Sequence, residues 1–217
     1  MFLPITLCIV GFSLCDKIME YINLQGRYYG VHAIANGAII SLTWKNFFDA
    51  YLLRNLVLNN MDTLTLYKAK SIIYALHLYH ILLYYKKMRF DDWLHHILML
   101  GVSLPLTELV PPTSILGHSM FFINGLPGMI DYTLLFLVRN NHMSKYTEKY
   151  INRLVNIWIR CPGCIMTTTL IIVNMGLHYN IMSTTQFIAS TIMAGCVYWN
   201  GIYFMDQVVR DYALTCQ

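Results

Sequence analysis

The chain has 217 residues, a formal net charge of +4, 57% hydrophobic residues and 12% charged residues. A soluble domain carries about 45–50% apolar and about 25% charged residues, so this chain has too few polar side chains to cover a globular surface. The composition excludes a disordered protein, a coiled coil and a basic nucleic-acid-binding arm. It predicts an all-α membrane protein in which residues 1–217 form a single transmembrane helix bundle.

Apolar stretches divide the chain into seven candidate spans, because a spanning helix needs about 20 predominantly apolar residues. The spans cover about 2–14, 29–52, 64–85, 93–110, 114–138, 151–175 and 183–204. The first is as short as a signal peptide, but no Lys or Arg precedes it and no clear cleavage site follows it. We expect seven spans, or six if this segment is removed. Pro127 and Pro162 lie inside two spans and are expected to kink them.

Lysine and arginine residues mark one side of the predicted bundle. Ten of them follow the first, third, fifth and seventh spans or begin the sixth, whereas the loops on the opposite side contain only Arg54. Basic loops stay in the cytoplasm. The pattern predicts a cytoplasmic C-terminus and, with seven spans, an N-terminus on the lumenal or outer side.

Six cysteines are scattered through the chain, mostly in apolar stretches, which does not fit a disulfide framework. Cys161-Pro-Gly-Cys164 has the spacing of a redox motif, but a long apolar run follows it. The motif predicts a helix bend with two buried thiols, with a redox site as the second interpretation.

Polar residues at membrane depth are costly and are functional candidates by default. On the third span they form a stripe at helical spacing: Lys70, Tyr74, His77, His80 and Tyr84. The histidines of this stripe have a plainer interpretation, because they can simply bond to neighbouring helices.

The fourth span begins with Asp91-Asp92-Trp-Leu-His95-His96. Each carboxylate lies four residues before an imidazole, so the two share a helix face and the acid can fix the tautomer of the histidine. Leucine would pack better at these positions, so the run favours a catalytic or ligand-binding role.

The fifth and sixth spans carry further polar groups. Asn124 and Asp131 share one face of the fifth, and Arg160 lies on a polar side of the sixth with Asn152, Arg153 and Asn156. Arg160 is expected to pair with Asp131 or Asp206. His32 and His178 are interpreted as surface or packing histidines. We expect a cavity lined by His77, His80, His95, His96, Asn124 and Asp131.

The run Arg89-Phe-Asp-Asp-Trp-Leu-His95-His96 resembles the signature of the TLC-domain superfamily, which includes ceramide synthases, translocation-associated membrane proteins and small lipid-regulating proteins. Ile130-Asp131-Tyr132 resembles the ceramide synthase segment after the histidine helix, and the stretch from Asn152 to Arg160 resembles the arginine-ended helix that comes next. The resemblance covers about residues 28–203. It implies a polytopic helix bundle of the endoplasmic reticulum with a role in sphingolipid or other lipid metabolism.

A ceramide-synthase-like enzyme would transfer an acyl group from acyl-CoA, a co-substrate rather than a bound cofactor, to the amine of a long-chain base. His95 or His96 would act as the base or nucleophile, and Asp92 and Asp131 would orient an imidazole. The other histidine or Tyr74 would donate to the oxyanion. Further substrate-binding candidates, including basic groups for the CoA phosphates, are His77, His80, Asn124, Arg160, Lys86, Lys87, Arg89 and Arg139.

Catalytic activity stays open at this stage. Ceramide synthases carry a His-Asp pair where this chain has Pro127 and Gly128, which favours a non-enzymatic lipid-binding or membrane-composition regulator. A translocation helper is a second alternative. A membrane di-metal oxygenase is a third, but too few histidines remain for further histidine boxes and we expect no metal. Expected partners are membrane lipids, a long-chain base and acyl-CoA, with no nucleic acid, and a homo-oligomer is left open.

Overall fold

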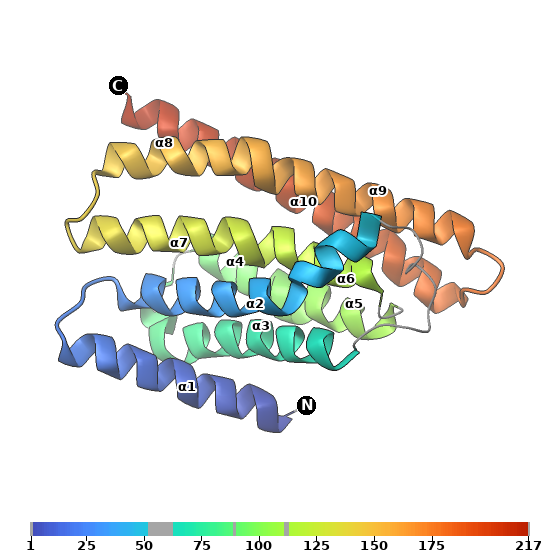
Figure 1. Cartoon of the computed structure of the whole chain (residues 1–217), viewed down its shortest axis with the longest axis horizontal. Helices are drawn as coiled ribbons and strands as arrows, with labels where there is room; N and C mark the ends of the chain where they lie inside the picture. Colours follow the sequence, from blue (N-terminus) through green and yellow to red (C-terminus); the bar gives the residue numbers. More distant parts are fainter. Residues whose placement is uncertain (1, 52–62, 89, 111–112, 217) are drawn as a thin grey trace.

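The computed structural model describes residues 2–51, 63–88, 90–110 and 113–216, with the backbone alone described for Phe2, Lys87, Asp91 and Asp92. Every regular element in these ranges is helical, and the long helices run roughly along one direction (Figure 1). The predicted all-α fold is confirmed.

The helices follow the predicted order. The first half contains α1 (Phe2–Tyr21), α2 (Arg27–Tyr51), α3 (Thr63–Tyr84) with the 3-10 turn η1 (Tyr85–Lys87), α4 (Phe90–Leu98), the π-helical turn η2 (Met99–Ser103) and α5 (Leu104–Leu109). The second half contains α6 (Ser114–Met120), η3 (Phe121–Gly125), α7 (Leu126–Arg139), α8 (Lys145–Val155), η4 (Asn156–Arg160), α9 (Cys161–Leu177) and α10 (Thr184–Thr215).

A π-helical turn precedes Pro105, Pro127 and Pro162, each of which lies well inside a continuous helix. Pro105, Pro127 and Pro162 are the second residues of α5, α7 and α9, and η2, η3 and η4 come immediately before these helices. Proline has no N–H and its ring clashes with the carbonyl four residues back, so one wider turn relieves the clash. The expected interruptions at Pro127 and Pro162 are therefore wide turns within continuous helices.

Three helices extend beyond their predicted apolar cores. α1 continues through Lys17 to Tyr21, α8 begins at Lys145, and α10 continues through Arg210 to Thr215. At the start of α8 the Ser144 hydroxyl accepts a hydrogen bond from the Thr147 N–H, which caps the helix. The apolar residues show which part of a helix suits the membrane. Backbone hydrogen bonds and helix caps extend the helix beyond that part. Several basic residues assigned to loops therefore lie on helices.

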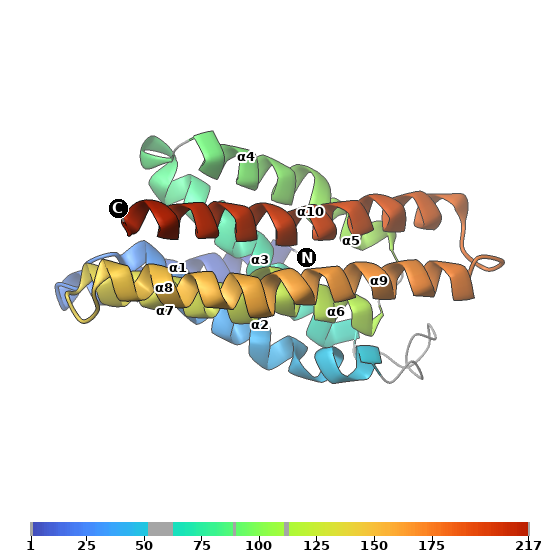
Figure 2. The same cartoon turned by 90° about the horizontal axis from the view of Figure 1, so that it is seen from above.

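α2 lies at the centre of the packing, against α3, α6 and α7, while α1 covers α3. α9 and α10 are antiparallel neighbours, which Figure 2 shows from above. Small residues let the helices approach: a Cβ on Gly163 of α9 would lie 2.1 Å from the Phe122 ring. This use of glycine is typical of helix contacts in membranes. Cys161 and Cys164, on the same helix, are buried free thiols, as the helix-bend interpretation predicted.

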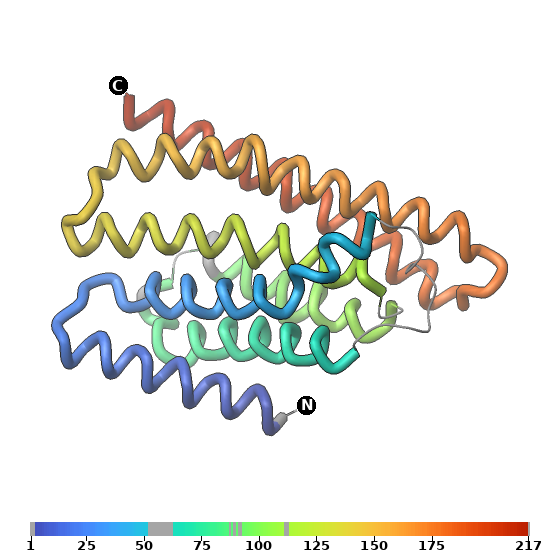
Figure 3. Tube along the Cα trace, viewed as in Figure 1, coloured from blue at the N-terminus to red at the C-terminus, as the bar shows by residue number. Residues whose placement is uncertain are grey.

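Three continuous helices among the described residues are long and apolar enough to cross a membrane: Ser114–Arg139, Lys145–Leu177 and Thr184–Thr215. They support a membrane protein, although they are fewer than the six or seven spans predicted. The chain trace in Figure 3 brings the α1–α2 loop, the α7–α8 loop and the C-terminus to one end of the bundle, with the α9–α10 loop at the other. The Asn140 side chain joins the first two loops through hydrogen bonds with the Gln25 backbone.

Candidate functional site

Five of the eight histidines gather where α2, α3 and α4 meet: His32, His77, His80, His95 and His96. His77 and His80 are about one turn apart and share a face of α3. His95 and His96 are adjacent on α4, so their side chains point about 100° apart. His96 is 2% exposed, whereas His95 is only half-buried.

His96 joins the histidine cluster through both ring nitrogens. Its Nδ1 lies 3.0 Å from Nδ1 of His77, and its Nε2 lies 2.6 Å from Nδ1 of His80. Nδ1 of His80 also lies 3.4 Å from the hydroxyl of Tyr28. A neutral imidazole has one donor and one acceptor nitrogen, so His96 donates to one neighbour and accepts from the other. The three rings therefore form a linear hydrogen-bonded chain.

Aromatic rings from α2 and α7 pack around the His80 end of this chain of three histidines. The Tyr28 ring lies 4.3 Å from the His80 ring and 4.0 Å from the His32 ring, measured between centroids. His32 also lies 4.5 Å from the Tyr132 ring of α7 and bonds through Nδ1 to the Tyr28 carbonyl at 2.9 Å. The interpretation of His32 as a surface or packing residue missed this position within the cluster.

A polar group at the ends of α1, α2 and α3 borders the cluster. The Tyr84 hydroxyl donates to Oδ1 of Asp16 at 2.9 Å, and the Tyr84 ring lies 5.5 Å from the Tyr28 ring. Arg27 lies 3.5 Å from Asp16 and 2.7 Å from Glu20. These contacts connect the histidine cluster with the end of the bundle that carries the α1–α2 loop.

His95 occupies the rim of the cluster facing α10. Its ring centroid lies 5.1 Å from that of His77 and 6.3 Å from that of Phe204. His95 is less buried than His96, whose two nitrogens are both engaged by other histidines. Of the two predicted catalytic histidines, His95 is therefore the one better suited to meet a substrate.

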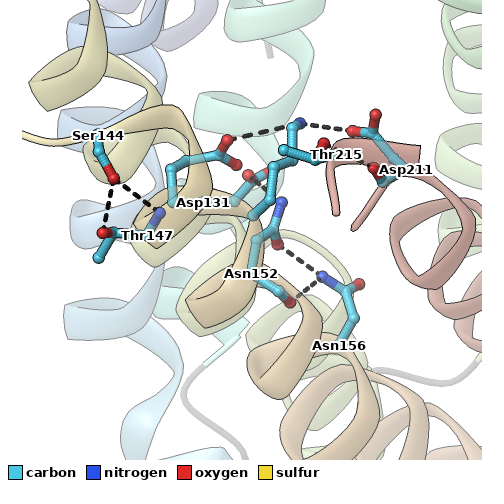
Figure 4. Close-up of polar contacts among 9 residues, drawn as sticks. Asp131, Ser144, Thr147, Asn152, Asn156, Asp211 and Thr215 are labelled. Carbon is cyan, nitrogen blue, oxygen red and sulfur yellow. Dashed lines mark hydrogen bonds and ion pairs between the residues drawn. The ribbon is translucent and has the colours of Figure 1, made fainter. Parts of the chain in front are cut away.

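Asp131 belongs to a different polar group. Its Oδ1 accepts a hydrogen bond of 2.7 Å from Nδ2 of Asn152, and Nδ2 of Asn156 donates to Oδ1 of Asn152 at 2.7 Å (Figure 4). The Arg160 guanidinium donates to Oδ1 of Asn156 at 3.4 Å. We call Asp131, Asn152, Asn156 and Arg160 the amide ladder. The contacts described for Asp131 lead into this ladder rather than to a histidine, contrary to its expected orienting role.

At the end of the amide ladder, Arg160 forms a hydrogen bond with the backbone of a neighbouring helix. Its Nη2 donates to the carbonyl of Ile123 at 3.3 Å, and its guanidinium lies 4.8 Å from the centroid of the Phe204 ring. Ile123 is four residues before Pro127, which has no N–H to offer that carbonyl. Arg160 thus satisfies a carbonyl that the proline frees, instead of the ion pair expected with Asp131 or Asp206.

The start of α8 is tied to α10 by charged and aromatic contacts. Lys149 pairs with Asp211 and lies 3.5 Å from Oε2 of the buried Glu148. Arg153, expected to line the polar side of the sixth span, stacks over Tyr212 at 4.4 Å. These groups hold the two helices together beside the amide ladder.

A cavity of about 60 Å³ lies between α3, η2, α5, α6, η3 and α10. Asn124 lines it, as predicted, but the histidines and Asp131 do not; its walls are Ile73, Met99, Ser103, Leu104, Leu106, Thr107, Leu116, Ser119, Met120, Ile123, Asn124, Met193, Cys196, Val197 and Asn200. This cavity therefore does not have the expected lining of His77, His80, His95, His96, Asn124 and Asp131, of which it contains only Asn124.

The cavity and the histidine cluster lie next to each other along three of the same helices. Ile73 precedes His77 by four residues, Met99 follows His95 by four, and Asn200 precedes Phe204 by four. Residues four apart lie on one helix face about one turn apart. On each of three helices, a residue that lines the cavity therefore lies about one turn from a residue of the group formed by His77, His95 and Phe204.

The remaining predicted site residues lie away from the histidine chain or beyond description. Lys70 pairs with Glu108 of α5 at 2.7 Å, Tyr74 packs against both apolar cores, and Lys86 is exposed beside the Tyr85 ring. Arg139 is exposed next to Tyr29. The residues Arg54 and Arg89, and the side chains of Lys87, Asp91 and Asp92, lie outside the description.

Sequence reasoning missed Tyr28, Tyr132 and Phe204 as neighbours of the histidines. A weak signal existed for Tyr28, because it lies four residues before His32 on one helix face. No comparable signal connects Phe204 with a histidine more than a hundred residues away.

No protein-family model, curated protein or solved structure matches this chain. Within the ranges that the structure describes, no group of three or more His, Cys, Asp and Glu side chains is arranged to hold a metal ion. The site must therefore be interpreted from its own residues.

Proposed function

We propose that this protein is a multi-pass membrane protein of the TLC type that acylates the amine of a long-chain base with acyl-CoA. The observation that carries the proposal is the cluster of five histidines inside the helix bundle, four of which are buried. Ionisable groups at membrane depth are retained for function, because apolar residues would be cheaper there. Imidazoles can act as bases, acids and nucleophiles in acyl transfer.

We further propose that the seven continuous helices of the described residues all cross the membrane, namely α1, α2, α3, α4–α5, α6–α7, α8–α9 and α10. α2 and α3 have 25 and 22 residues, which is enough for a span of about 20. Their histidines face the cluster rather than lipid. α1 presents an exposed apolar row that suits lipid contact: Leu3, Leu7, Val10 and Leu14. The end with the α1–α2 and α7–α8 loops would be cytoplasmic, since ten basic residues were assigned to that side. The endoplasmic reticulum is the proposed location.

In the proposed reaction His95 acts on the substrate. The amine nitrogen attacks the thioester carbonyl, the carbon–sulfur bond breaks, and CoA leaves as a thiol. His95 would serve as general base or carry the acyl group briefly, and His77, whose ring lies 5.1 Å away, supports it. Lys86, Lys87, Arg89 and Arg139 are proposed contacts for the CoA phosphates, because basic groups bind phosphate strongly.

The direct test uses membranes that contain the protein, labelled acyl-CoA and a panel of long-chain bases and lysolipids, with the products identified by mass spectrometry. We expect an N-acylated long-chain base. His95→Ala should lower turnover by about 10²–10⁴-fold. His118→Gln is the matched control, because His118 is also buried but bonds to Thr167 and Tyr51 outside the cluster. Equal activity of wild type and His95→Ala would reject the assignment of His95.

A non-enzymatic lipid-binding regulator is the second candidate, and the cavity favours it. The cavity is mainly apolar, and Oδ1 of Asn200 in its wall is buried without a hydrogen-bond partner within the described chain. A bound lipid with a hydroxyl or amine could satisfy this oxygen. This candidate predicts no acyl transfer by wild type, and binding of sphinganine that Asn200→Leu weakens and His95→Ala leaves unchanged.

A further inference from the structure

The hydrogen bonds within the histidine cluster define a direction. Nε2 of His77 is buried and has no hydrogen-bond partner among the described residues. Buried N–H groups without an acceptor are rarer in proteins than acceptors without a donor. The proton of His77 is therefore assigned to Nδ1, which donates to Nδ1 of His96 across 3.0 Å.

The same reasoning fixes the other two rings. Because Nδ1 of His96 accepts from His77, its proton lies on Nε2, which donates to Nδ1 of His80 across 2.6 Å. The proton of His80 then lies on its Nε2. One free lone pair remains at the start of the chain, on Nε2 of His77, and it is available to accept a proton.

We propose that His77, His96 and His80 form a proton relay that takes up a proton at Nε2 of His77 and delivers it to His80 beside Tyr28. When Nε2 of His77 is protonated, its Nδ1 proton moves to Nδ1 of His96. The Nε2 proton of His96 then moves to Nδ1 of His80. Each proton crosses one hydrogen bond, no ring rotates, and the positive charge ends on His80.

Beyond His80 the surroundings become more polar. The Tyr28 hydroxyl lies 3.4 Å from Nδ1 of His80, in the first turn of α2. Asp16 and Arg27 lie close to this point at the end of the bundle. Among the described residues, the other titratable groups with rings against this chain are His32, His95 and Tyr84, and Tyr132 lies behind His32. The relay therefore leads from the rim near His95 toward the end with the α1–α2 loop.

The relay rests on the proposed acyl transfer for the source of its proton. A long-chain base is an ammonium ion at neutral pH. The ammonium ion and the acyl-CoA thioester give an amide, a CoA thiol and one released proton, as a carbon–nitrogen bond replaces a carbon–sulfur bond. The thiol keeps one proton of the amine, and the amide keeps another. In a membrane-buried site the third proton needs a path out, which the histidine chain provides.

The first test is spectroscopic and needs no turnover. The full chain, labelled with ¹⁵N-histidine and placed in lipid nanodiscs, should show nitrogen–nitrogen couplings across two hydrogen bonds, with His77 protonated at Nδ1. His77→Gln should remove one coupling and His96→Gln both, while the control His118→Gln keeps both. Absence of the couplings in wild type, or a proton on Nε2 of His77, would overturn the relay.

The second test measures turnover. His80→Ala should lower kcat by about 10²-fold with little change in the acyl-CoA KM, because in the proposed relay His80 receives a proton and does not bind acyl-CoA. Added 4-methylimidazole should restore part of the rate of His80→Ala but not of His95→Ala. His80→Gln, which keeps a hydrogen-bonding group but cannot relay a proton, should match the loss with the thermal stability retained.

The outcomes separate the relay from the acyl transfer. Couplings in wild type without any acyl transfer would support the histidine chain and reject the proposed function. Acyl transfer without the couplings, or full activity of His80→Gln, would reject the relay and leave the function standing.

Discussion

The histidine cluster and the amide ladder are both polar groups inside an apolar helix bundle, yet they differ in their hydrogen bonding. In the ladder the donor and acceptor atoms are chemically fixed, and the series ends by satisfying the Ile123 carbonyl. In the histidine chain each ring can exchange its donor and acceptor nitrogens, and Nε2 of His77 has no hydrogen-bond partner among the described residues. Fixed roles suit helix packing, whereas exchangeable roles suit proton transfer.

The largest expected effect is on rate and concerns His96. His96→Gln should lower turnover by about 10²–10⁴-fold, because glutamine can hold a hydrogen bond but cannot pass a proton. The protein should still elute as a folded monodisperse species. Steady-state kinetics with acyl-CoA and sphinganine provide the measurement. Unchanged turnover would show that the histidine chain has the same structural role as the ladder.

The next effect is on stability and concerns the contact between α9 and η3. Gly163→Ala would bring a Cβ to 2.1 Å from Cδ1 of Phe122, and overpacking of this kind costs about 1–3 kcal/mol. Gly176→Ala on the same helix is the control, since a Cβ there meets nothing within 4 Å. The free energy of unfolding in mixed micelles should fall only for Gly163→Ala. Equal values for the two variants would contradict the tight contact.

A comparable loss of stability is expected at the end of the amide ladder. Arg160→Met keeps much of the side-chain volume but removes the donors to the Ile123 carbonyl and to Asn156, at a cost of about 1–3 kcal/mol. The same unfolding measurement applies, and turnover per folded molecule should change little. A large loss of turnover with unchanged stability would indicate that Arg160 acts on the substrate and not in helix packing.

The smallest effect is expected for Asp131→Asn. Asparagine retains the Oδ1 atom that accepts from Asn152, so stability should change by about 0.5–1.5 kcal/mol at most. Turnover should stay within a factor of two, because the described contacts of Asp131 lead to the ladder. If Asp131→Asn instead reduced turnover as strongly as His95→Ala, the carboxylate would have to act on the histidines, as the sequence first suggested.

Local patterns in the chain predict much of this fold. Apolar runs locate each helix, and Pro127 and Pro162 mark the places where two long helices must adjust. The spacing of three residues also places His77 and His80 on one helix face, because residues of the same helix that are about one turn apart point in similar directions. His77, His80, His95 and His96 lie in contact with one another, whereas Asn124 and Asp131, which were expected to line one cavity with them, have other neighbours.

Other parts of the site could not be predicted in this way. Asp131 and Tyr132 are adjacent, but Asp131 bonds to Asn152 while Tyr132 packs against His32. A rotation of α7 by about 100° about its axis would exchange these roles. His32 and Phe204 join the site from helices that are distant in sequence. The helical periodicity around each residue does not reveal which neighbouring helix its side chain faces.

The amino-acid sequence alone is enough to predict an apolar all-helical chain, the order and approximate extent of its helices, and the pairing of histidines within α3 and within α4. These properties depend on residue composition and on bonding within a few turns. Three features became visible only in the folded chain: His96 bridges two histidines of α3, Arg160 reaches the carbonyl freed by Pro127, and the cavity lies one turn from the histidine cluster. Those contacts depend on how whole helices rotate and pack against each other, which no local pattern specifies.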